Sequence, residues 1–163
     1  MSLDEWASAL ELSSMWQMTK IREMAVQEIL LLHKQAGTEC QKVLLKLSSK
    51  LEIREIRDAV IQALSGALGP VERIHLGTEF RVYSWLLEGY KQLVLNGISV
   101  EDEERLGWKT TSKLFRVRDA YLLQRQPLRR FNRYSQVDML DCIVTPLVLK
   151  TFAEELEAAD WSE

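Results

Sequence analysis

The stretch GPVERIHLGTEFRVYSWLLEGYKQLVLNGISVEDEERLG, residues 69–107, decides the fold of this chain. Pro70 suits the first position of a helix, where its missing N–H would have no partner in any case. Gly77 interrupts the first apolar face, and apolar residues resume at helical spacing beyond Val82. Gly97 tolerates the left-handed conformation that commonly ends a helix. The stretch therefore predicts two helices joined by a tight corner.

The rest of the chain shows the same pattern of helical segments separated by helix-ending residues. Apolar residues recur three and four positions apart between short breaks, and Ser2 with Glu5 fits a capping box. No segment combines apolar–polar alternation with the β-branched enrichment expected of strands. Ser99 suits the cap of a short acidic helix. We predict an all-α fold, a helical bundle or short solenoid of repeated helix pairs with a long C-terminal helix.

The chain also aligns with itself. Leu-Ser-Ser occurs at residues 12–14 and again at 47–49, and the match continues without a gap to Ile-Arg-acid at 21–23 and 56–58. A fainter third copy begins with Leu-Gly-Thr at 76–78. We interpret the pattern as a helix pair present three times, in which residues 36–68 duplicate the pair before them.

Large residues at the corners and along the apolar helix faces are expected to form the core of these pairs. They are Trp16, Ile21, Ile56, Phe80, Trp85 and Tyr90. Ile21 and Ile56 occupy equivalent places in the first two copies, so we expect both to be buried.

The expected domain organisation follows from the prolines and the charges. Residues 1–126 form one helical-repeat domain, which ends before Pro127. Residues 127–135 form a basic linker, and residues 136–163 form a C-terminal helix that packs on the repeats. Pro146 is expected to bend that helix.

Three stretches carry a resemblance to a known family: WASALELSSMWQMTKIREMAV, GPVERIHLGTEFRVYSWLLEGYKQLV and ISVEDEERLGWKTTSKLFRVRD. Their order, over residues 4–120, resembles the helical region that follows the BTB/POZ domain in BTB-domain proteins of mushroom-forming fungi. That region is in turn similar to the BACK regions of adaptor proteins.

The resemblance implies a helical region without catalytic residues that accompanies a dimerising interaction domain. The BTB domain itself is not part of this sequence, so we expect either a fragment of a longer BTB protein or a stand-alone relative. Residues 36–68 add a helix pair between motifs that the family would place closer together.

Catalytic signatures are absent from the sequence. It contains no phosphate-binding glycine loop, no Gly-x-Ser-x-Gly turn and no His-Glu-x-x-His pair. His33 and His75 are single and distant, and Cys40 and Cys142 lack the paired spacing of a zinc site or a disulfide scaffold. We expect no enzyme, no cofactor and no metal.

The charged contact zone is expected in the basic segment 105–133, where nine Lys or Arg residues accompany one acid, Asp119. Such a segment could neutralise phosphates. We favour pairing of these cations with acidic residues of the same chain, because its net charge is -3. The candidate interaction residues are Lys109, Lys113, Arg116, Arg129, Arg130, Arg133 and, near the chain end, Trp161.

The main hypothesis is a non-catalytic protein–protein interaction or scaffold module, part of a BTB-type adaptor or a stand-alone relative. One alternative is a nucleic-acid-binding helical protein that uses the basic segment. Another is a helical protein with a small-molecule or catalytic pocket between helix pairs, where His75, Trp85 and Tyr90 would meet. Without a signal peptide or an apolar run of about 20 residues, we expect an intracellular protein, cytoplasmic or nuclear. Its partners are expected to be proteins, with a homodimer among the options, and neither membrane nor nucleic acid.

Overall fold

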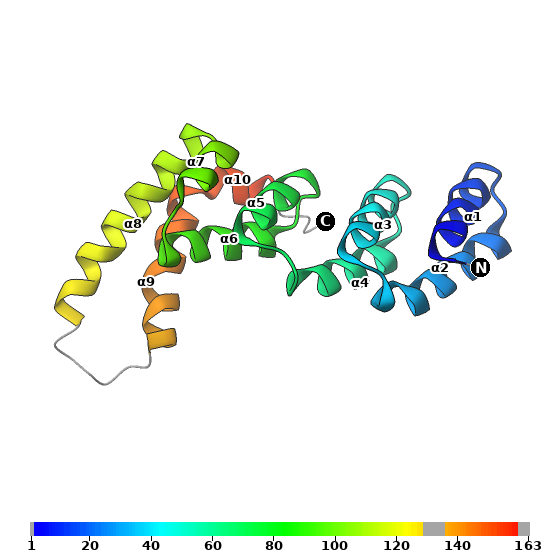
Figure 1. Cartoon of the computed structure of the whole chain (residues 1–163), viewed down its shortest axis with the longest axis horizontal. Helices are drawn as coiled ribbons and strands as arrows, with labels where there is room; N and C mark the ends of the chain where they lie inside the picture. Colours follow the sequence, from blue (N-terminus) through cyan, green and yellow to red (C-terminus); the bar gives the residue numbers. More distant parts are fainter. Residues whose placement is uncertain (1, 129–135, 160–163) are drawn as a thin grey trace. The chain divides into compact units, whose positions relative to one another are not determined.

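A computed structural model describes residues 2–128 and 136–159, and describes side chains over 2–124 and 142–159 (Figure 1). Every regular element within these ranges is helical, which confirms the predicted all-α fold. The helices are α1 (Leu3–Met15), α2 (Thr19–Leu32), the short 3-10 helix η1 (His33–Gln35), α3 (Thr38–Lys50), α4 (Arg54–Ser65), α5 (Pro70–Glu79), α6 (Tyr83–Asn96), α7 (Val100–Leu106), α8 (Trp108–Leu128), α9 (Gln136–Thr151) and α10 (Ala153–Glu157).

The chain divides into two compact units, Met1–Leu68 and Gly69–Glu163. The boundary therefore falls after Leu68, whereas the sequence interpretation placed residues 1–126 in one domain. The physical reason lies in α8, which packs on α6 and α9 and so joins the C-terminal helices to the α5–α6 pair. Ser2 with Glu5 and Ser99 with Asp102 form complete capping boxes, at the starts of α1 and α7.

The three helix pairs α1–α2, α3–α4 and α5–α6 turn through the same backbone corner. In each, a left-handed residue follows the end of the first helix: Gln17 (φ 54°), Glu52 (φ 55°) and Arg81 (φ 52°). The N–H of the next residue donates back to a carbonyl oxygen of the first helix, from Met18 to Ser13 at 2.8 Å, from Ile53 to Ser48 at 2.9 Å and from Val82 to Gly77 at 2.9 Å. This closing bond defines a Schellman motif. The duplication and the solenoid arrangement stay predictions.

The acceptor position of each corner carries a small residue. Ser13 and Ser48 are buried, and their hydroxyls donate to carbonyl oxygens of their own helices at 3.0 Å. At Gly77 a Cβ would lie only 3.0 Å from Leu86 Cγ. Small residues here allow the second helix to approach the first closely, as the Leu-Ser-Ser pattern suggested.

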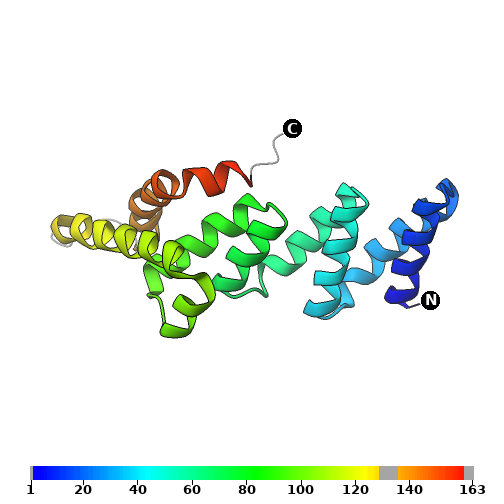
Figure 2. The same ribbon diagram turned by 90° about the horizontal axis from the view of Figure 1, so that it is seen from above.

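Unit 1 consists of two helix pairs lying side by side (Figures 1 and 2). Lys50 Nζ lies 2.6 Å from Glu11 Oε1 and thereby links α3 to α1. Its buried apolar residues come from both pairs: Leu10, Ala25, Ile29, Leu44, Leu45, Ile53, Ile56, Val60, Leu64 and Leu68.

Unit 2 packs α8, α9 and α10 against the α5–α6 pair around two stacked rings. The ring centroids of Tyr90 and Phe152 lie 3.9 Å apart, with 15° between their planes. Phe152 separates α9 from α10, so the predicted single C-terminal helix is two helices. The break lies at this inward-turned ring and not at Pro146, which α9 includes. Likewise α8 extends past Pro127 to Leu128, because a proline near a helix end removes only one hydrogen bond.

The predicted core residues divide into three groups. Ile56, Trp85 and Tyr90 are buried, and Phe80 is half-buried. Trp16 is 69% exposed and Ile21 is 41% exposed, so the expectation that these two are buried is wrong. The physical reason is their place in the first pair: within unit 1 no helix pair covers this side of α1–α2, whereas α1–α2 covers the matching side of α3–α4.

Gly89→Ala should lower the free energy of unfolding of the whole chain by about 1–3 kcal/mol, the usual cost of overpacking. A Cβ at Gly89 would lie 2.8 Å from Ile74 Cγ1 and 2.9 Å from the Pro70 carbonyl oxygen, so α5 and α6 would have to separate. Denaturant unfolding followed by circular dichroism measures the change. Gly66→Ala is the matched control, because a Cβ there meets nothing within 4 Å. Equal effects of the two substitutions would contradict the close packing.

Glu52→Gly should give a protein more stable than Glu52→Ala by about 1 kcal/mol, because glycine adopts the left-handed conformation without a Cβ penalty. Glu52 is exposed, so neither substitution removes a buried contact. The same denaturant experiment compares the two variants. An alanine variant as stable as the glycine variant would show that the corner is not left-handed in solution.

Candidate functional site

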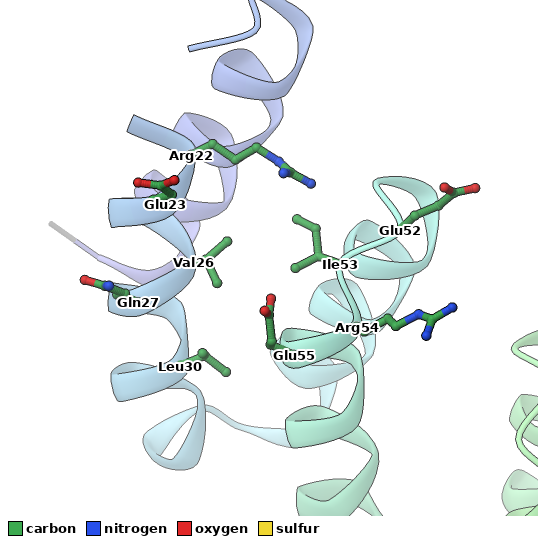
Figure 3. A pocket seen from close by; sticks show the side chains of 9 residues that line it. All are labelled: Arg22, Glu23, Val26, Gln27, Leu30, Glu52, Ile53, Arg54 and Glu55. Carbon is green, nitrogen blue, oxygen red and sulfur yellow. The ribbon is translucent and has the colours of Figure 1, made fainter. Parts of the chain in front are cut away.

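A groove of about 570 Å³ lies in unit 1 between α2 and the corner that joins α3 to α4 (Figure 3). Its apolar floor comes from Val26, Leu30 and Ile53. Figure 3 shows Val26 and Leu30 pointing from α2 toward the corner, and Ile53 pointing back. Val26 and Leu30 are half-buried and Ile53 is buried, so the accessible part of the floor comes from α2.

The rim of this groove carries charges of both signs. Arg22, Glu23 and Gln27 stand on α2, and Glu52, Arg54 and Glu55 stand on the corner and the first turn of α4. The lining includes no histidine, cysteine or hydroxyl side chain, and its carboxylates are exposed. Chemically, the groove can hold an apolar side chain and pair charges beside it.

Sequence reasoning missed this groove because it forms between two successive helix pairs. One wall is a stripe with four-residue spacing on α2, Arg22, Val26 and Leu30, which occupies one helix face. The other wall is the corner at residues 52–55, whose direction depends on the left-handed Glu52. The stripe was visible in the sequence, but the corner that faces it was not.

Three members of the predicted basic surface, Lys109, Lys113 and Arg116, lie on α8 within the described residues. Lys113 Nζ lies 2.6 Å from Glu155 Oε1 and 5.4 Å from the centre of the Phe152 ring, so this cation links α8 to α10 inside unit 2. Lys109 and Arg116 are exposed on α8. The other candidates lie outside the described residues: Arg129, Arg130, Arg133 and Trp161.

The predicted meeting of His75, Trp85 and Tyr90 around a pocket does not match their surroundings. His75 is exposed, whereas Trp85 and Tyr90 are buried. Phe152 covers the ring face of Tyr90, and burial, with a smaller effect from Glu155, raises the pKa of the Tyr90 hydroxyl well above its usual range. The neutral, stacked side chain of Tyr90 is therefore part of the hydrophobic core of unit 2.

Cys40 lies half-buried on α3, beside Asp4 of α1. Partial burial and the neighbouring Asp4 carboxylate, 3.7 Å from the sulfur, raise the pKa of the Cys40 thiol, which lowers its reactivity. Among the described residues, no three His, Cys, Asp or Glu side chains are grouped to hold a metal ion. Nor does any helix in these ranges have the length and apolar character needed to cross a membrane.

Comparison of the chain with protein-family models, with curated proteins and with solved structures gave no match.

Lys113→Ala should lower the free energy of unfolding by about 1 kcal/mol, because it removes a half-buried ion pair and a cation–ring contact at once. It also leaves Glu155 Oε2, a buried oxygen without a hydrogen-bond partner, on a carboxylate with no cation beside it. Lys109→Ala, one turn earlier and exposed, is the matched control and should change stability by less than about 0.5 kcal/mol. If both variants unfold at the same denaturant concentration, Lys113 is a surface cation and not a link between helices.

Proposed function

We propose that this chain is a non-catalytic protein–protein interaction module that holds a segment of a partner protein in the groove of unit 1. The single observation that carries the proposal is the apolar floor of the groove, half-buried Val26 and Leu30 against buried Ile53, inside a rim of both charges. Apolar clefts with a few placed polar groups are the usual form of binding sites. The three rim carboxylates, Glu23, Glu52 and Glu55, are exposed, which suits charge pairing with a bound partner.

The chemistry of the groove defines the kind of partner. An apolar side chain would enter between α2 and the α3–α4 corner, with acidic and basic residues beside it to pair with Arg54 and with Glu55. Both of these rim residues are exposed, so their pairs add selectivity more than affinity. A short amphipathic peptide segment fits this description.

The resemblance to the helical region of fungal BTB-domain proteins makes the proposal more specific. In that setting the module would be the scaffold part of a BTB-type adaptor, or a stand-alone relative, and would act in the cytoplasm or the nucleus. Support comes from the order of the three quoted stretches and from the helical hairpins that two of them form, α1–α2 and α5–α6.

Nucleic-acid binding through the basic segment is the weaker candidate. Lys113, in its middle, already pairs with Glu155, and the chain is acidic overall. A nucleic-acid binder would lose affinity steeply with salt, with a log–log slope of about -0.7 to -0.9 for each phosphate neutralised.

A peptide library displayed on phage and selected against the full chain tests the groove. We expect the selected peptides to share an apolar residue flanked by charges, and Leu30→Glu to weaken them by at least about tenfold, or 1.4 kcal/mol. Leu31→Glu is the matched control, because the neighbouring Leu31 is 69% exposed and does not line the groove. Peptides that bind both variants equally, or a selection without a shared motif, would contradict the proposal.

A further inference from the structure

The first helix pair exposes several large apolar side chains at its corner and along α2. Five side chains that are between 41% and 69% exposed define what we call the first-pair face: Leu12, Trp16, Met18, Ile21 and Met24. Single exposed apolar residues are normal on a soluble protein, whereas a cluster of five that includes a tryptophan marks an interaction site.

In the second helix pair, the side chains at the equivalent positions are covered. Its equivalent residues, 35 positions later, are buried or half-buried: Leu47, Leu51, Ile53, Ile56 and Ala59. Ile53 lines the groove opposite α2, and Leu51 lines a second hollow with Ser14, Gln17 and Arg22 of the first pair. The backbone corner is the same in both pairs, so the difference in burial comes from the neighbour and not from the local fold.

The charges on α2 indicate a second copy of the chain as the occupant. Lys20 stands four residues before Met24, and Glu28 stands four residues after it. If two α2 helices lie antiparallel about a two-fold axis at Met24, Lys20 of each copy faces Glu28 of the other. The face is therefore complementary to itself in charge as well as apolar, as an isologous interface requires.

The size and composition of the face fit such a contact. Five large side chains, each about half exposed, remove several hundred Å² from water on each copy, which approaches the roughly 800 Å² per partner of a specific interface. Met18 and Met24 are flexible and polarizable, so they can adapt to the shape of the surface that covers them.

We propose that the first-pair face is a dimer interface, on which a second copy of this chain docks its own first-pair face about a two-fold axis. The inference goes beyond the proposed function, because the face lies on the corner of the first pair and not in the groove. A variant that no longer dimerises would still bind peptides in the groove, so each proposal can be contradicted independently of the other.

Sedimentation of the full chain over about 1 to 100 μM tests the proposal across the usual affinity range of reversible dimers. We expect a species of twice the 18.9 kDa chain mass, and at least about tenfold weaker association in Ile21→Lys. Leu123→Lys is the control, because Leu123 is 68% exposed on α8, in unit 2. Circular dichroism and peptide binding in the groove should be unchanged in both variants.

Charge reversal tests the two-fold arrangement. Lys20→Glu alone and Glu28→Lys alone should each weaken the dimer, and the double variant should restore it, because the pairing is then reversed but complementary. A wild-type chain that stays monomeric, assemblies larger than a dimer, or a dimer insensitive to Ile21→Lys would overturn the proposal. The proposal would also be overturned if neither Lys20→Glu alone nor Glu28→Lys alone weakened the dimer.

Discussion

The rest of the structure depends on one backbone hydrogen bond, repeated at three corners. In each, the residue after a left-handed turn donates its N–H to the helix it has just left, as Ile53 does to Ser48 at 2.9 Å. This bond satisfies a carbonyl at the helix end and sets the direction of the next helix. It requires a residue with positive φ, a small acceptor residue and an aliphatic residue after the turn. Glu52, Ser48 and Ile53 meet these three requirements in the second pair.

The corner also determines which surfaces are available for binding. At the second corner, Ile53 points toward the neighbouring helix pair (Figure 3). In unit 1, α2 covers Ile53 and forms the groove in doing so. Met18 has the same backbone position in the first pair and is 47% exposed. One local motif thus accounts for both the groove and the first-pair face, and the two surfaces call for different partners.

The sequence alone predicted the local structure, namely the helix caps and the corners. It did not predict which helices pack against one another. Ser2 and Ser99 predicted their caps, and the Leu-Ser-Ser pattern located two of the corners, because caps and turns depend on residues close in the chain. Trp16 and Ile21 were predicted to be buried from their places at the corner and along the apolar helix face, but burial depends on what lies beside a pair, which no local pattern contains. The groove escaped prediction for the same reason. The pairing of Lys113 was predicted in part. The sequence indicated that it would pair with an acidic residue of the same chain, but Glu155 is identified as the partner only by the packing of α10 on the rest of unit 2.

Amide hydrogen exchange of the full chain, resolved by residue, tests the central claim most directly. The N–H groups of Met18, Ile53 and Val82 close the three corners, so all three should exchange far more slowly than the same residues in an unstructured peptide. The neighbouring exposed residues of the loops, such as Gly37, provide the internal reference. Protection at all three corners is the result that the account predicts. Exchange of the Ile53 or the Met18 N–H at the unprotected rate would contradict it, because the groove is defined by the α3–α4 corner and the first-pair face by the α1–α2 corner.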